Sequence, residues 1–161
     1  MSKNRKIIIT LILLSATAAF STTSISTNYL PTVHTSLIEC LPDAPSIGIL
    51  NYTQQGVMNE SLDKSAVATC PVKLDAPGKS YTINAVVSAN ARSKGGSVQC
   101  ELNEVDSLNG KIVKTYSNSA NVDTDSTAPL TWYDIKRTAN GVFNVKCTLP
   151  PNTSLLSISV T

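Results

Sequence analysis

The sequence predicts an all-β protein: a single disulfide-linked antiparallel β-sandwich of about eight strands, preceded by an N-terminal signal peptide. Three observations support this prediction. From residue 47 onward, short alternating runs are separated by turn residues, and no convincing helical period is present. The four cysteines form an even set, as in disulfide-linked exported domains. Residues 1–20 have the composition of an export signal.

Residues 1–21 are predicted to be the signal peptide. A short basic head, residues 1–6, is followed by an apolar segment, residues 7–20, in which small residues gather toward the end. The strongly apolar stretch, residues 7–14, is too short for a spanning helix, which needs about 20 apolar residues. We therefore expect export to the periplasm or the extracellular space, and no stable membrane insertion after cleavage.

The following segment, residues 22–39, is predicted to be a flexible leader because it is rich in Ser and Thr and lacks turns and periodicity. It contains His34, the single histidine of the chain, which we expect to be solvated. The β-sandwich domain is expected to span residues 40–161. A domain of this size can form a core without a metal or a partner.

The strands follow from the alternation and the turns. Residues 81–88 alternate apolar with mostly polar side chains, as in a strand with one buried face. Asn109-Gly110 is a strong hairpin signal, and residues 118–128 are expected to form a polar loop. The spacing favours a two-sheet sandwich over a βαβ fold, with a partly closed barrel as the alternative. In order, strands are expected at residues 47–53, 66–72, 81–88, 98–102, 111–117, 130–132, 143–149 and 156–160.

Cys40, Cys70, Cys100 and Cys147 are expected to form two disulfides. None lies in a CxxC motif, which disfavours zinc and thiol redox chemistry. Four cysteines allow three connectivities, and spacing alone does not choose among them. Cys100 and Cys147 each precede a Leu by two residues, which places Cys and Leu on one inward face. We therefore favour a bond between Cys100 and Cys147, which leaves Cys40 to pair with Cys70.

Several motifs together carry a resemblance to a known group of proteins. They are Asn59-Glu60-Ser61, Cys70-Pro71-Val72, Cys100-Glu101-Leu102, and a segment at residues 143–151 that ends in Cys147-Thr148-Leu149-Pro150-Pro151. Over about residues 40–161 the chain resembles a group of short exported bacterial proteins of unknown function. The resemblance implies a disulfide-linked β-sandwich, and it carries over no catalytic residue.

The charge pattern argues against several ligand classes. The formal net charge is +2, from 13 basic and 11 acidic residues, but Lys3, Arg5 and Lys6 lie in the predicted signal peptide. From Ser21 onward, 10 basic residues therefore stand against the 11 acidic ones, a net charge of −1. No basic surface is predicted, so we expect no nucleic-acid partner.

No catalytic site is predicted. A lone histidine in the leader cannot supply a Ser-His-Asp triad in the core, and Gly-rich phosphate motifs are missing from the sequence. A pocket that brought Glu101 or Glu104 close to Asp134 would indicate an enzyme. We expect no enzyme activity, no cofactor and no metal.

Tyr133, next to Trp132, is the candidate surface-binding residue. If Trp132 is in the core, the alternation turns Tyr133 outward, where its ring could stack on a sugar or anchor a partner. The predicted function is a non-catalytic binding or structural module with an unidentified partner in the cell envelope or extracellular space. The alternatives are a carbohydrate-binding module and a surface-fibre subunit.

Overall fold

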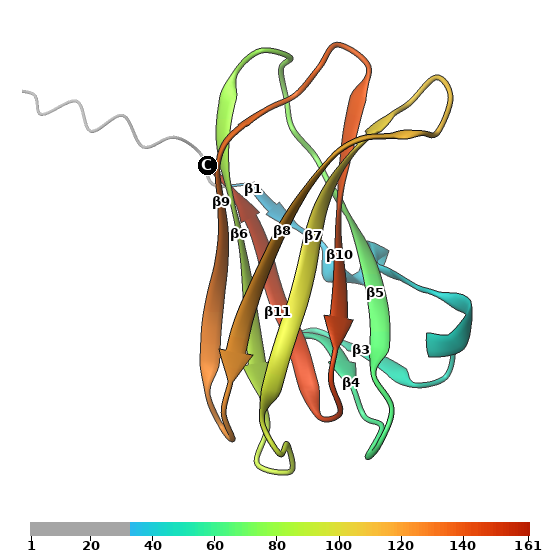
Figure 1. Ribbon diagram of the computed structural model, residues 1–161, viewed down its shortest axis with the longest axis vertical. Helices are drawn as coiled ribbons and strands as arrows, with labels where there is room; N and C mark the ends of the chain where they lie inside the picture. Colours follow the sequence, from blue (N-terminus) through green and yellow to red (C-terminus); the bar gives the residue numbers. More distant parts are fainter. Residues whose placement is uncertain (1–32) are drawn as a thin grey trace, which may run out of the picture.

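Two antiparallel β-sheets lie face to face (Figure 1). The structure, a computed structural model, describes residues 33–161, and the predicted signal peptide and leader residues 22–32 lie outside the described residues. Short 3-10 helices, η1 (Leu37–Glu39) and η2 (Ala44–Ser46), lie near the start of the described chain. Within residues 33–161, none of the helices has the length and hydropathy to cross a bilayer.

Each sheet has its own strand order. The six-stranded sheet runs β3 (Leu50–Thr53), β4 (Gly56–Asn59), β11 (Thr153–Val160), β6 (Ser80–Ala89) and β9 (Thr127–Lys136), and β1 (Val33–Thr35) pairs with β11. The five-stranded sheet runs β2 (Leu41–Pro42), β5 (Ala66–Val72), β10 (Gly141–Leu149), β7 (Gly96–Asp106) and β8 (Ile112–Val122). The predicted β-sandwich is confirmed.

The core fills the space between the sheets because alternate side chains of each strand point inward. In β6, every second residue from Tyr81 to Ala89 is at most 4% exposed. In β10, the same alternation runs from Phe143 to Leu149, with at most 3% exposure. Burial of each large apolar side chain contributes about 1.5 to 3 kcal/mol, so these two central strands are a main source of stability.

The strand at residues 111–117 is longer than predicted, and the predicted loop at residues 118–128 is wrong. β8 continues to Val122, and only residues 123–126 separate it from β9. Its Ser and Asn residues are typical of loops, but β8 is an edge strand with an exposed outer face. Backbone pairing with β7 along the whole strand, which the sequence does not reveal, determines its conformation.

The start of the domain also differs from the prediction. The strand expected at residues 47–53 begins at Leu50, and β4 follows it as an unpredicted hairpin partner. Gly56 opens β4 with φ of +142°, and a Cβ there would overlap the backbone carbonyl of Leu155 in β11. Glycine at this position therefore allows β4 to approach β11 closely.

The predicted flexible leader is wrong for residues 33–39. These residues form β1 and η1, and β1 pairs with the end of β11 so that Val33 lies opposite Val160. A strand of three residues is too short to show a periodicity. The ordered domain therefore includes residues before Cys40, because β11 offers an edge on which β1 can pair.

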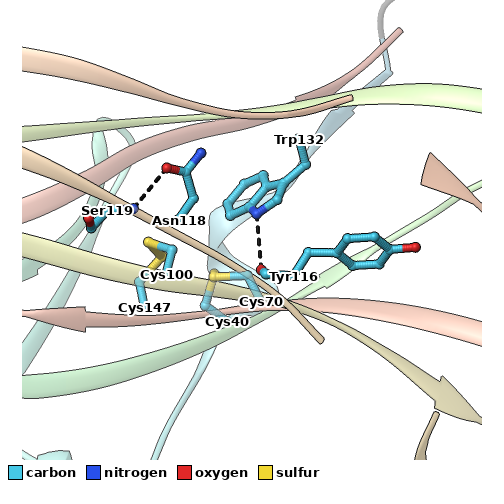
Figure 2. Close-up of a disulfide and its surroundings, with 8 residues drawn as sticks. All are labelled: Cys40, Cys70, Cys100, Tyr116, Asn118, Ser119, Trp132 and Cys147. Atoms are coloured by element: carbon cyan, nitrogen blue, oxygen red, sulfur yellow. Dashed lines mark hydrogen bonds between the residues drawn. A yellow bond between two sulfur atoms is a disulfide. The ribbon is translucent and has the colours of Figure 1, made fainter. Parts of the chain in front are cut away.

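Two disulfides are present, and both brace the five-stranded sheet. Cys40 is bonded to Cys70, and Cys100 to Cys147 (Figure 2). Cys100 and Cys147 lie directly opposite each other on β7 and β10, and Cys40 immediately precedes β2, the partner of β5. This is the connectivity that the strand phase favours. All four sulfur atoms lie in the core.

β8 and β9, the end strands of different sheets, are connected by side chains. The Asn118 amide nitrogen donates to the Thr131 carbonyl at 3.0 Å. The Trp132 indole nitrogen donates to the Tyr116 carbonyl at 3.0 Å, as Figure 2 shows. No backbone ladder joins β8 to β9 among the described strands. The fold is thus a sandwich with one bridged edge rather than the partly closed barrel.

Candidate functional site

Tyr133 lies on the outer face of the six-stranded sheet, near the end of β9. Trp132 is 5% exposed in the core, whereas Tyr133 is 74% exposed. The two neighbouring rings therefore point to opposite sides of the sheet, as the alternation predicts. The ring of Tyr133 presents a large apolar face to solvent, which is the feature that a stacking ligand needs.

A β-bulge places Tyr133 and Asp134 beside one another on β9. The register between β6 and β9 shifts at this point, and Asp134 has φ of +52°. The Ser80 hydroxyl donates to the Asp134 carboxylate at 2.6 Å, and the Lys136 ammonium lies 3.6 Å from it. The Ser80 hydrogen bond and then the Lys136 charge lower the pKa of Asp134. An ionised acceptor is therefore fixed next to the Tyr133 ring.

A row of polar residues crosses the same outer face. Thr131 lies opposite Asn84, Asn84 opposite Ser159, and Ser159 opposite His34, on β9, β6, β11 and β1. The Thr131 hydroxyl donates to the Asn84 amide oxygen at 2.8 Å. Since neighbouring strands lie about 4.8 Å apart, the row extends about 14 Å. Tyr133 follows Thr131 by two residues, so its ring lies at one end of the row.

The outer face of the five-stranded sheet carries a second polar surface, a shallow depression of about 380 Å³ between β7 and β8. Gln99 lies opposite Ser119, and Glu101 lies opposite Ser117. The hollow arises because both β8 residues are serines, whose side chains are short. This depression faces away from Tyr133, on the other side of the sandwich.

The predicted acidic residues have separate surroundings. Glu101 lines the depression, while Glu104 lies on the inner face of the same sheet, 2% exposed, and accepts a hydrogen bond from the Thr138 backbone nitrogen at 2.8 Å. Asp134 belongs to the other sheet. Glu101 and Glu104 thus point to opposite faces. Within residues 33–161, no group of three or more His, Cys, Asp or Glu side chains is placed to hold a metal ion.

Sequence reasoning missed the polar surface on β7 and β8. Ser119 lies within the predicted loop at residues 118–128, and a loop prediction gives no alignment between Ser119 and Gln99. The available signal was the alternation that continues beyond residue 117, in which Ala120 and Val122 share the inward phase of Tyr116. Extending β8 on that signal would have brought Ser117 and Ser119 to one outward face.

Comparisons with known proteins identify the fold. No protein-family model matches the chain, and no curated protein sequence matches it. A solved xylan-binding module, CBM15, has a TM-score of 0.54 at 15% identity, covering 81% of this chain and 95% of that chain. The C-terminal family 22 carbohydrate-binding module of Clostridium thermocellum Xyn10B has a TM-score of 0.51 at 12% identity, covering 80% and 88%.

A third solved structure, the CBM22-2 xylan-binding domain of Paenibacillus barcinonensis Xyn10C, has a TM-score of 0.50 at 8% identity, covering 81% of this chain and 94% of that chain. At such low identities the likeness shows a shared β-sandwich fold and nothing about a shared ligand. The resemblance to short exported bacterial proteins stays a prediction.

Proposed function

We propose that this protein is an exported, non-catalytic binding module whose ligand is a carbohydrate. The observation that carries the proposal is the exposed Tyr133 ring at the end of the row formed by Thr131, Asn84, Ser159 and His34. Modules of the same fold are xylan-binding by name, which makes a sugar polymer the first ligand class to test.

The chemistry of this face suits a sugar chain. A pyranose ring has an apolar face that stacks on an aromatic side chain, and its hydroxyls both donate and accept hydrogen bonds. Tyr133 offers the stacking surface, Asp134 beside it accepts, and Asn84 and Ser159 continue the polar contacts. Because all these residues lie on paired strands, little conformational entropy is lost on binding.

The surroundings of the acidic residues support a non-catalytic role. Glycoside hydrolysis needs two carboxyl groups that face each other across a cleft, about 5 to 10 Å apart. Here Asp134 is held by Ser80 and Lys136, and Glu104 is buried against the Thr138 backbone. Both carboxyl groups therefore have partners within the fold, and Glu104 is also buried. This supports a structural role for the two groups over a role as acid or base.

Affinity electrophoresis in gels that contain xylan, β-1,4-galactan or a soluble cellulose derivative tests the proposal. We expect the mature protein to be retarded by at least one neutral polysaccharide, and Tyr133→Ala to lose at least about tenfold in affinity. The matched control is Leu108→Ala. Leu108 is 79% exposed in the β7–β8 hairpin, away from the Tyr133 face, so its removal should leave retardation unchanged.

Three outcomes would contradict the proposed function. The absence of retardation by every neutral polysaccharide would reject the ligand class. Equal retardation of Tyr133→Ala and the unsubstituted protein would reject the face, because the stacking surface would then contribute nothing. Detectable release of reducing sugar, lost on neutralising Asp134, Glu101 or Glu104, would instead make the protein an enzyme.

A surface-fibre subunit is the second candidate, and one observation favours it. Residues 33–35 of the expected leader add a strand to β11 through backbone pairing, which is also how a donated strand would join a neighbouring copy. Light scattering of the mature protein over a range of concentrations tests this. Monomers throughout would indicate that β1 pairs within its own chain, and chains of copies would favour the fibre.

Export is the remaining part of the proposal. The two disulfides are typical of proteins from an oxidising compartment, which supports a location outside the cytoplasm. We expect the mature protein to begin between Ala19 and Ile25. Intact-mass analysis of protein recovered from the periplasm and medium measures this directly, and retention of Met1 in the mature form would contradict it.

A further inference from the structure

One end of the sandwich carries two adjacent depressions that share a wall. The first has a volume of about 420 Å³ and is lined by residues that include Glu60, Asn90 and Arg92. The second, of about 390 Å³, is lined by Arg92, Lys94, Leu62 and Pro151, among others. Asn152 and Arg92 line both depressions, so the two hollows are contiguous. This end lies opposite the one that carries the β7–β8 hairpin (Figure 1).

The loop that separates the depressions is held by hydrogen bonds at both ends. The Asn90 side chain accepts from the Arg92 backbone nitrogen at 2.9 Å, and the Asn90 backbone nitrogen donates to the Asn152 carbonyl at 3.1 Å. The Ser93 hydroxyl accepts from the Gly95 nitrogen at 3.1 Å, and its backbone carbonyl accepts from the Thr124 hydroxyl at 3.0 Å. The loop is therefore organised before any ligand arrives.

The two cations of this loop are available to a ligand. Arg92 and Lys94 are exposed, and neither makes an ion pair with another of the described residues, 33–161. The second depression has no acidic residue in its lining, while Leu62 and Pro151 supply apolar surface. Asp123 lies close to Gly95 but does not line either depression. A site with two cations and an apolar wall favours an anionic group attached to a ring.

The first depression differs in charge. Glu60 lines it, and the Asn51 amide nitrogen donates to the Glu60 carboxylate at 2.7 Å, which fixes the carboxylate position. A fixed carboxylate accepts hydrogen bonds from sugar hydroxyls and repels an anion. The first depression thus has one cation and one carboxylate in its lining, and the second has two cations and no carboxylate. This contrast favours a neutral sugar beside Glu60 and an acidic sugar in the depression that Arg92 and Lys94 line.

We infer that this end of the sandwich is a second binding site, specific for an acidic oligosaccharide, with Arg92 and Lys94 holding its carboxylate or sulfate group and Glu60 accepting from a neighbouring neutral sugar. The site is separate from the Tyr133 face, and it does not require that face to bind a neutral polysaccharide. An arginine fork and an ammonium bind carboxylate and sulfate by the same charge-assisted hydrogen bonds.

Isothermal titration calorimetry on the mature protein tests the inference with four probes: a hyaluronan hexasaccharide, a sulfated chondroitin hexasaccharide, an uncharged xylohexaose and inorganic sulfate. We expect at least one acidic hexasaccharide to bind, with affinity that falls as salt rises, and inorganic sulfate alone to bind at least about tenfold more weakly. Both acidic hexasaccharides carry carboxylates, and only the chondroitin probe carries sulfate. Tighter binding of the chondroitin probe would therefore assign the site to sulfate, and equal or weaker binding would assign it to carboxylate.

Charge-matched variants locate the site. The double variant Arg92→Gln with Lys94→Gln should reduce affinity for the acidic probe at least about tenfold. The control is Lys79→Gln with Lys111→Gln, which removes two exposed cations at the other end and should leave this affinity unchanged.

Asn152→Asp adds a negative charge on the shared wall with almost no change in size, and should weaken binding of the acidic probe similarly. Asn152 has φ of +58°, a conformation that Asp also tolerates. Melting temperatures of all variants verify folding.

Three results would overturn the inference: no binding of either acidic hexasaccharide, equal losses in the two double variants, or binding of sulfate as tight as that of the hexasaccharide. Tyr133→Ala distinguishes this site from the proposed function. It should weaken retardation by neutral polysaccharide while leaving the acidic titration unchanged, so either site can fail without the other.

Discussion

The indole nitrogen of Trp132 donates a hydrogen bond to the backbone carbonyl of Tyr116 at 3.0 Å, and this bond joins the edge strands of two different sheets (Figure 2). The Tyr116 carbonyl lies on the edge of β8 that has no strand partner among the described strands. One side chain thus serves two purposes, since its ring fills the core and its N–H covers an open edge.

Trp132→Phe should separate these two purposes. Loss of the hydrogen bond and part of the ring volume is expected to lower the free energy of unfolding by about 1 to 3 kcal/mol, measured by urea denaturation. Tyr116→Phe is the control, because Tyr116 takes part through its backbone, and its change should be at most about 0.5 kcal/mol. Equal losses in the two variants would show that the bond across the edge is unimportant.

Trp132→Ala and Tyr133→Ala form a pair that tests the assigned faces. Trp132→Ala should lower the free energy of unfolding by about 3 to 5 kcal/mol because it leaves a cavity in the core. Tyr133→Ala should change it by at most about 0.5 kcal/mol, because that ring contacts mainly solvent. Thermal melts of both variants check this, and similar shifts would reverse the assignment of the two rings.

Loss of the Cys100–Cys147 disulfide should be strongly destabilising. Replacing both cysteines with Ala is expected to lower the free energy of unfolding by about 2 to 5 kcal/mol, much of it through a less constrained unfolded chain. Denaturant titration measures the loss. In the unsubstituted protein, alkylation without reductant should label none of the four cysteines, and peptide mapping that linked Cys70 to Cys100 would contradict the connectivity.

The pKa of Asp134 should depend on Ser80. Because the Ser80 hydrogen bond is the largest cause that lowers this pKa, Ser80→Ala should raise it toward the ordinary aspartate value. A lowered pKa in the folded state stabilises the fold above the unfolded pKa, and this stabilisation is lost as pH falls through the folded pKa. NMR titration of the Asp134 carboxyl carbon measures the shift, with Lys136→Gln expected to give a smaller one.

Central strands could be predicted because their two faces differ in polarity. The alternation in residues 81–88 identified β6, and the positions of Cys147 and Leu149 identified the inner face of β10. β8 is longer than the sequence predicts because an edge strand can carry Ser and Asn on its exposed face and still be paired. β1 was missed because three residues carry no period, and only the edge of β11 orders them.

The candidate site likewise has one part that local alternation predicts and another that only strand pairing determines. The outward position of Tyr133 could be predicted because its neighbour Trp132 had to be buried. The row from Thr131 through Asn84 and Ser159 to His34 could not be predicted, because it depends on the register of four strands. Register is set by pairings between distant segments, for which local sequence gives no direct signal.

Both disulfides lie in the five-stranded sheet, so the sandwich has one covalently cross-linked layer and one held by backbone pairing and packing alone. Under tension or brief heating, the cross-linked five-stranded sheet should stay folded longer than the six-stranded sheet. Fraying should begin in the six-stranded sheet, which carries β1, β3 and β9. Amide hydrogens of the six-stranded sheet should exchange first. Since Tyr133 lies on that sheet, the face that we assign to binding depends on strand pairing and core packing, and not on a disulfide, to keep its residues in register.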